Sequence, residues 1–222
     1  MRSKFYHQKT FLSSKINHWQ KFLTSPPEIF CGILEKMESK PLRYLVLDLA
    51  FFIATIGICL LISPIGLKDN HGVSYYEHYG LPLIPYALGF FAVAFLTFLV
   101  ARSLPQSNHK LINLKYVFYA ISVLVFGVLA TPDYINSFFN WAHMIVSTIL
   151  FIIEFILAGW LAIFELKDKI NLSLVLLLFS TGLLAFASNI NWTRYLFTSE
   201  VAFQIIFFFI FVRTASKVKL FG

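Results

Sequence analysis

The sequence has few charged residues for its length. Only 13% of its 222 residues are Asp, Glu, Lys or Arg, whereas 58% are hydrophobic, and the mean hydropathy is +0.74. A soluble domain of this size has no single core that could bury so much apolar surface. The composition therefore excludes a soluble globular protein and predicts an integral membrane protein.

The sequence also lacks the short motifs of several enzyme classes. It contains no GxSxG nucleophile elbow, no P-loop, no glycine fingerprint for dinucleotides and no HExxH motif. Its two cysteines, Cys31 and Cys59, form no cysteine cluster of the kind that holds zinc or an iron–sulfur centre. The topology predicted below also places them on opposite sides of the membrane, where they cannot pair. We therefore expect no cofactor and no bound metal.

Long apolar runs are the most prominent feature that is present. Five clear runs and a sixth, interrupted one are each close to the roughly 20 residues that cross about 30 Å of hydrocarbon. None shows the alternation of a barrel strand, and an open sheet would leave backbone groups unpaired in lipid. The sequence predicts an all-α bundle of six transmembrane helices, at about 43–63, 81–101, 112–130, 139–164, 171–190 and 196–213.

Lys and Arg residues are distributed unevenly around these spans. Sixteen of the eighteen fall on one side, and only Lys68 and Arg194 fall on the other. Because basic flanks stay in the cytoplasm, we predict that both termini are cytoplasmic. A plasma or inner membrane is the default location. The net charge of +7 then orients the protein and attracts anionic membrane lipids, its expected partners, and we expect no nucleic acid partner.

The chain divides into three parts. Residues 1–42 form a basic amphipathic cytoplasmic segment, in which apolar side chains recur at helical spacing between positions 12 and 23. This pattern is typical of a helix lying on the membrane surface, and a partly disordered basic tail is the alternative. Residues 43–213 form the transmembrane domain, and residues 214–222 form a short basic cytoplasmic tail.

The fourth span carries a polar stripe inside the apolar run FNWAHMIVSTILFIIEFILAGWLAIFE. His143, Glu154 and Glu165 are eleven residues apart, and eleven residues make three helical turns plus about 20°, so the three share one face. Asn140 and Ser147 lie beside that face. Since a carboxylate in hydrocarbon is costly, Glu154 is expected to face the bundle interior or water. It either bonds a neighbouring helix as a structural group or carries protons, binds a cation or acts as an acid or base.

Asp48 in the first span shares a helix face with Thr55 and Cys59. It lies toward the cytoplasmic surface, so one interpretation is a simple ion pair with a nearby basic residue. The candidates for that ion pair are Arg43, Arg102 and Lys167. The other interpretation is that Asp48 faces the polar stripe of the fourth span.

The outer end of the sixth span supplies further polar groups. Glu200 and Gln204 are four residues apart and share a helix face. Arg194, in the preceding connection, either pairs with Glu200 or contacts a lipid phosphate. Together with His143, these residues are expected to form a polar pocket near the outer leaflet.

The first outer connection, KDNHGVSYYEHYGLP, is rich in groups that bind divalent cations. It holds Asp69, His71, Glu77 and His78, and Asp133 lies on the same side of the membrane in the third connection. The spacing of these residues matches no known metal motif, so a solvated interfacial loop is expected.

The segment SYYEHYGLPLIPYALGF leads from this loop directly into the second span. This arrangement and the six-span plan resemble the superfamily that includes the DRAM autophagy modulators and the Frag and Sfk membrane proteins. In that family a Ser and a Gly in the first loop precede the second span, and the corresponding residues here are Ser74 and Gly80. The resemblance implies a lipid-associated membrane protein whose relatives are linked to lipid remodelling or bilayer asymmetry, and it carries across no catalytic residues.

Three functions fit these observations. The leading hypothesis is a non-enzymatic protein that binds or moves a lipid, small solute or ion through a polar cleft beside the fourth span, with Glu154 as its protonatable centre. The second is an intramembrane lipid-modifying enzyme with His143 and Glu200 as acid and base. The third is a structural protein whose polar stripe packs against another helix, a second copy of the chain or another membrane protein.

Overall fold

A computed structural model describes residues 39–64, 71–78, 80–106 and 109–217 of the chain. Residues 1–38 lie outside the described residues, and so do the amphipathic helix expected there and Cys31. Lys68 and Asp69 also lie outside the described residues.

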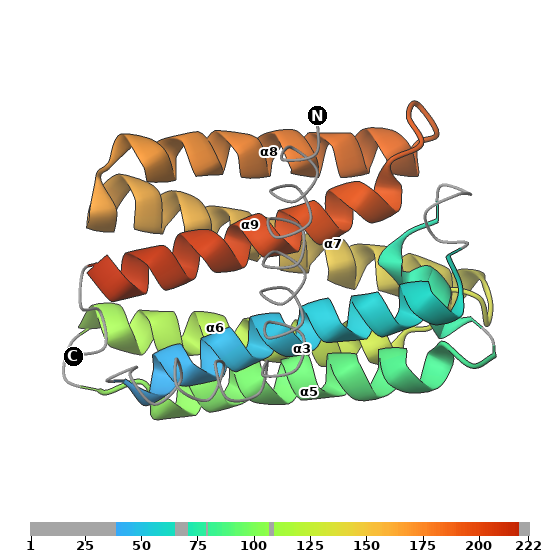
Figure 1. Ribbon diagram of the computed structural model, residues 1–222, viewed down its shortest axis with the longest axis horizontal. Helices are drawn as coiled ribbons and strands as arrows, with labels where there is room; N and C mark the ends of the chain where they lie inside the picture. The colour runs from blue at the N-terminus through green and yellow to red at the C-terminus, as the bar shows by residue number, and fades with distance from the viewer. Residues whose placement is uncertain (1–38, 65–70, 79, 107–108, 218–222) are drawn as a thin grey trace, which may run out of the picture. The chain divides into compact units, whose positions relative to one another are not determined.

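Six long α-helices make up most of the described chain (Figure 1). They are α3 (Lys40–Ile62), α5 (Leu83–Ser103), α6 (His109–Ala130), α7 (Ser137–Trp160), α8 (Lys169–Asn189) and α9 (Leu196–Lys217). A short 3₁₀ helix, η1 (Val73–Glu77), precedes α5, and a π-helical segment, η2 (Leu161–Leu166), extends α7. Each of the six spans is long and apolar enough to cross a membrane, and the described residues contain no strand. The predicted all-α class and six long apolar helices are confirmed, to within a few residues at each boundary.

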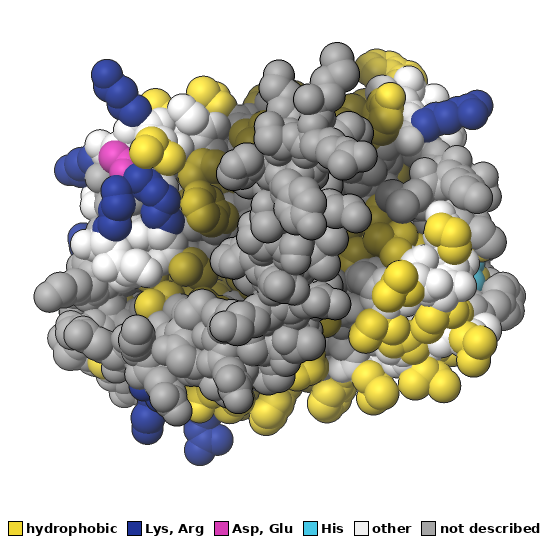
Figure 2. Space-filling model, in the orientation of Figure 1, with side chains coloured by type: hydrophobic (Ala, Val, Ile, Leu, Met, Phe, Trp, Pro, Cys, Tyr) yellow, Lys and Arg dark blue, Asp and Glu magenta, His cyan; other side chains and the backbone are white. Residues whose placement is uncertain are grey.

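Successive helices run in opposite directions, so α3 begins and α9 ends at the same end of the bundle (Figure 1). We call this the basic end, because Lys110, Lys169 and Arg213 lie at helix termini there. The opposite end is the loop end, where η1 lies. In Figure 2, Lys and Arg side chains gather mainly at the basic end, and hydrophobic side chains occupy much of the visible described surface between the ends.

The exposed surface of the helices is apolar. Leu61, Ile84 and Ile156 have 88%, 63% and 63% of their surface exposed, and many other large hydrophobic side chains are exposed with them. In water this surface would be an unusually large apolar patch, whereas in lipid it needs no cover. The exposure is therefore the expected outer surface of a membrane-embedded bundle.

The helices pack with unequal closeness. The contacts between α3 and α5, between α5 and α6 and between α8 and α9 are extensive, whereas α7 contacts α8 and α9 only sparsely. The closest approach is between α3 and α5, where a Cβ atom on Gly89 would lie 1.8 Å from Thr55 Oγ1. Ser122 of α6 in turn donates a hydrogen bond to the Ala94 carbonyl of α5, at 2.8 Å. The loosest packing is therefore along α7, where it faces α8 and α9.

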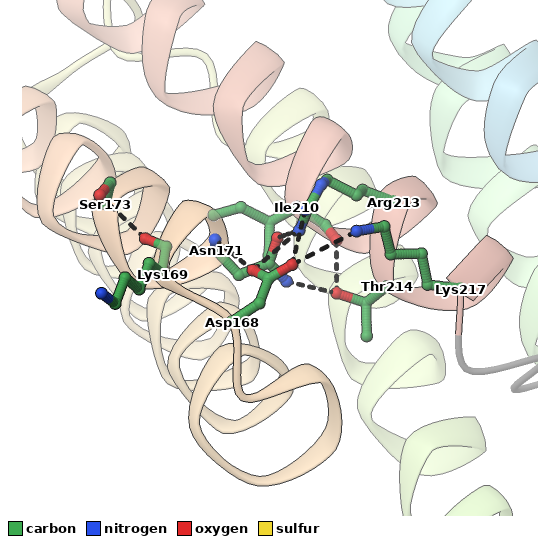
Figure 3. Close-up of polar contacts among 8 residues, drawn as sticks. All are labelled: Asp168, Lys169, Asn171, Ser173, Ile210, Arg213, Thr214 and Lys217. Atoms are coloured by element: carbon green, nitrogen blue, oxygen red, sulfur yellow. Dashed lines mark hydrogen bonds and ion pairs between the residues drawn. The ribbon is translucent and has the colours of Figure 1, made fainter.

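A polar network ties α8 to α9 at the basic end (Figure 3). Asp168 caps α8 by accepting from the Asn171 amide at 2.7 Å, and it pairs with Arg213 at 2.6 Å. Hydrogen bonding from Arg213 holds the pKa of Asp168 well below its ordinary value. Asn171, fully buried, donates to Thr214 Oγ1 at 2.8 Å, and Lys217 lies 3.5 Å from Asp168.

These contacts explain a difference from the predicted boundaries. The sequence places the end of the sixth span at residue 213 and a tail at 214–222, but α9 continues through Lys217. Thr214 and Ala215 are buried, and the pairing of Lys217 with Asp168 holds the last helical turn against α8. A hydropathy pattern ends at the first charge, Arg213, whereas the contacts of Thr214 and Lys217 with α8 extend the helix beyond it.

Candidate functional site

A cavity of about 100 Å³, here called the inner cavity, lies between α3, α5, α6, α7 and α9. Most of its wall is aliphatic or aromatic. The candidate site residues that line it are Asp48, His143, Ser147, Glu154, Glu200 and Gln204. The structure thus brings six of the eight candidate residues, from three separate helices, to one internal space.

Glu154 lies on the cavity face of α7 and is only 3% exposed. Gln204 of α9 donates a hydrogen bond from Nε2 to Glu154 Oε2 at 2.7 Å. Glu154 therefore faces the bundle interior, as expected from the cost of a carboxylate in lipid. Gln204, which the sequence groups with Glu200 at the outer end, contacts the mid-span glutamate.

Asp48 of α3 is 1% exposed and lines the same cavity. Thr97 of α5 donates to its Oδ2 atom at 2.7 Å, and its Oδ1 atom is buried without a hydrogen-bond partner. The proposed ion pair with Arg43, Arg102 or Lys167 is not the contact that Asp48 makes. Thr97 is not among the residues predicted for the site, although a threonine in the middle of an apolar span is a signal for a polar partner.

His143 and Glu200 lie at the loop end of the cavity and have separate partners. His143 Nδ1 lies 2.9 Å from the Thr131 carbonyl oxygen. Because a carbonyl only accepts, Nδ1 is assigned the hydrogen of this contact. Glu200 Oε2 accepts from the Val73 amide of η1 at 2.7 Å, so η1 is held against α9.

A second and larger space, here called the lateral groove, has a volume of about 520 Å³. It runs along the sparse contact between α7 and α8 and is also lined by residues of α9 and of the segment before η1. Five residues line both spaces: Ser74, His143, Ser147, Phe151 and Glu200. The lateral groove and the inner cavity are therefore adjacent and share a wall at His143 and Glu200.

The described part of the first connection, at η1, is more buried than a solvated loop. Glu77 is 4% exposed, and its Oε2 atom is buried without a hydrogen-bond partner. Burial, aided by the charge of Asp133, raises the pKa of Glu77 to about 8. His78 Nε2 lies 2.6 Å from Asp133 Oδ1, which joins this connection to the one before α7. Within the described residues, no group of three His, Cys, Asp or Glu side chains is placed to hold a metal ion.

Three residues highlighted by the sequence lie away from the inner cavity. Asn140 is exposed and lines the lateral groove only. Glu165, the last member of the polar stripe, forms an ion pair with Lys110 at 3.0 Å at the basic end. Arg194 is exposed, lines neither space, and makes no ion pair with Glu200 in the described structure.

The fold and this site define a six-helix bundle compatible with a polytopic membrane protein. No known protein family matches the chain, and neither does any curated protein sequence or solved structure. The resemblance to the DRAM, Frag and Sfk superfamily stays a prediction.

Proposed function

We propose that this protein binds a lipid or another small amphiphile in the lateral groove and passes its polar part toward the inner cavity. The observation that carries the proposal is the shared wall at His143, Ser147 and Glu200, which places a groove between helices directly beside an internal space that holds buried carboxyl groups. A purely structural stripe would leave no such space, because packed helices fill their interfaces.

The chemistry of the lateral groove suits an amphiphile. Its loop end offers Asn140, His143 and Glu200, whereas Phe155, Leu178 and other apolar side chains line the rest. A volume of about 520 Å³ falls within the roughly 300–1,000 Å³ of small-molecule sites. A polar head would lie at the loop end and an apolar chain between α7 and α8.

The positive-inside rule gives the proposed orientation. The basic end would face the cytoplasm, so the polar end of the lateral groove would lie near the outer leaflet. Membrane lipids are the proposed partners, with a plasma or inner membrane as the location.

Saturable binding of a fluorescent single-chain amphiphile to the purified protein in nanodiscs tests this proposal. A Cβ atom on Gly182, which lines the groove, would lie 3.5 Å from Phe203, so Gly182→Leu places its side chain in the groove. We expect this variant to bind the amphiphile at least about tenfold more weakly, the equivalent of about 1.4 kcal/mol.

Gly159→Leu is the matched control, because nothing lies within 4 Å of a Cβ atom at Gly159 and the residue lines neither space. Its binding should equal that of the wild type. Binding that is not saturable, or that Gly182→Leu leaves unchanged, would contradict the proposal.

A lipid-modifying enzyme is the second candidate, and the position of His143 favours it. With Nδ1 bonded to the Thr131 carbonyl, Nε2 is the nitrogen left to act as a base on a bound amphiphile. Glu200 lines the same wall. This candidate predicts that His143→Gln abolishes turnover of a labelled lipid while preserving its binding, whereas a binding protein shows no turnover in either form.

A further inference from the structure

We infer that the inner cavity is a binding site for a small organic ammonium ion, held between Asp48 and Glu154. The inference rests on the proposed function, because the ligand would reach this site through the lateral groove. It specifies the chemical class of the group that the inner cavity receives.

The acidic side chains that line the inner cavity favour a cation as its ligand. Asp48, Glu154 and Glu200 contribute acidic side chains to its wall, and none of the described residues that line it is Lys or Arg. A buried carboxyl group avoids a large cost either by holding a proton or by pairing with a positive group, and an ammonium ion that enters the cavity supplies the second. The hydrogen bonds from Thr97 and Gln204 are neutral contacts and supply no compensating charge.

The carboxyl groups of the cavity have acceptor oxygens that lack a hydrogen-bond donor. Asp48 is 1% exposed, and its Oδ1 atom is buried without a partner, so a strong acceptor lacks a donor there. At Glu154, Gln204 occupies Oε2 and leaves Oε1 without a hydrogen bond. A primary ammonium group carries three donors, so it can supply the donor that Asp48 Oδ1 lacks and has others left for Glu154.

The wall of the cavity favours an organic cation over a metal ion. Phe52, Phe90, Phe118, Phe207 and Phe208 are among its lining residues. Aromatic faces attract alkylammonium groups and solvate their carbon atoms. Hard metal ions such as Ca²⁺ need about six to eight oxygen ligands, and no metal-binding group of three side chains occurs among the described residues.

The size of the cavity sets the size of the ligand. Its volume of about 100 Å³ is smaller than the roughly 150 Å³ of an apolar cavity that accommodates benzene. The ammonium group should therefore carry a short chain of only a few carbon atoms, or be the terminal amine of a larger molecule whose remainder lies in the lateral groove.

Calorimetric titration of the full chain in nanodiscs of zwitterionic lipid tests the inference with propylammonium chloride as the probe. 1-Propanol serves as the neutral analogue and sodium chloride as the inorganic control. We expect propylammonium to bind saturably, and we expect no saturable binding of 1-propanol or of sodium chloride. This comparison uses the wild-type protein alone. Equal binding of 1-propanol, or the absence of saturable propylammonium binding, would overturn the inference.

Substitution then locates the site. Asp48→Asn keeps the shape of the side chain and removes its charge, so propylammonium should bind about thirtyfold more weakly or worse. Glu165→Gln, a change to a carboxylate paired with Lys110 at the basic end, should leave binding unchanged. Wild-type affinity in a folded Asp48→Asn protein would count against the assignment.

The amphiphile assay described above separates the two proposals. If propylammonium does not bind but the amphiphile still binds and Gly182→Leu still weakens it, only the ammonium site is wrong. If neither ligand binds saturably, the proposed function fails as well.

Discussion

At the scale of single residues, the buried carboxyl groups determine what the site can do. Glu154 and Asp48 each accept one hydrogen bond from another helix, Glu154 from Gln204 and Asp48 from Thr97. A single neutral donor does not satisfy a group that offers two acceptor oxygens. Each carboxyl is therefore held in position by its partner and still has an oxygen with which to bind something else.

The hydrogen bond between Gln204 and Glu154 is expected to stabilise the fold. Gln204→Leu leaves Glu154 buried without its donor, which should lower the free energy of unfolding by about 1–3 kcal/mol. Reversible unfolding in mixed micelles measures this change. Adding Glu154→Leu to Gln204→Leu should recover part of the loss, since both polar partners are then gone. Strictly additive losses in this double-mutant cycle would contradict a direct contact.

Glu77 is expected to make stability depend on pH. Its pKa is raised to about 8 in the folded protein from an ordinary value of 4.5, so the folded state holds a proton that the unfolded state releases. The stabilising contribution is complete below about pH 4.5 and is lost as pH rises through about 8. We expect a loss of a few kcal/mol, since each pKa unit corresponds to about 1.4 kcal/mol.

Thermal unfolding between pH 5 and pH 9, compared for the wild type and Glu77→Gln, measures this dependence. The difference in stability between the two proteins should shift in favour of Glu77→Gln as pH rises. An unchanged difference over that range would show that Glu77 does not titrate in this way.

Helical periodicity explains which site residues could be predicted. The spacing of His143, Ser147 and Glu154 puts them on one face whatever surrounds the helix, and all three line the inner cavity. The partnership of Glu154 with Gln204 depends on how α7 and α9 pack. Sequence patterns within one helix carry no information on that packing.

At the scale of helices, the contrast between tight and loose packing creates the site. Gly89 lets α5 approach Thr55 of α3, while α7 remains sparsely packed against α8 and α9. Small residues commonly permit close helix approach in membranes, where packing replaces the hydrophobic effect as the main source of association. The lateral groove lies where such close packing is missing.

Gly89→Ala is expected to disrupt the contact between α3 and α5. The new Cβ atom would lie 1.8 Å from Thr55 Oγ1 and 2.6 Å from its Cβ atom, so one helix must shift. Overpacking of this kind should cost about 1–3 kcal/mol, measured as a loss of unfolding free energy. Gly57→Ala in α3 is the matched control, because nothing lies within 4 Å of a Cβ atom there. Equal effects of the two changes would argue against this helix contact.

At the scale of the whole molecule, length and hydropathy were enough to predict six helices and their approximate limits. The adjoining inner cavity and lateral groove could not be predicted, because they arise from which helices are neighbours and how closely they approach. Glu77 shows the same limit, since a polar connection appears solvated in sequence but is covered by its tertiary contacts in the structure.

The most direct test of the central claim is the aqueous accessibility of position 147, where the lateral groove meets the inner cavity. Ser147→Cys is made in a protein whose two native cysteines are replaced, and it is treated with a membrane-impermeant cationic thiol reagent from each side of sealed vesicles. Ser180→Cys is the control, since Ser180 is exposed on α8 and lines neither space.

We predict that Ser147→Cys reacts with reagent added on the side of the loop end and that Ser180→Cys, in contact with lipid, reacts poorly from both sides. Protection of Ser147→Cys by the bound amphiphile should accompany this result. A Ser147→Cys protein that resists the reagent from both sides as fully as Ser180→Cys would contradict a ligand path through the lateral groove.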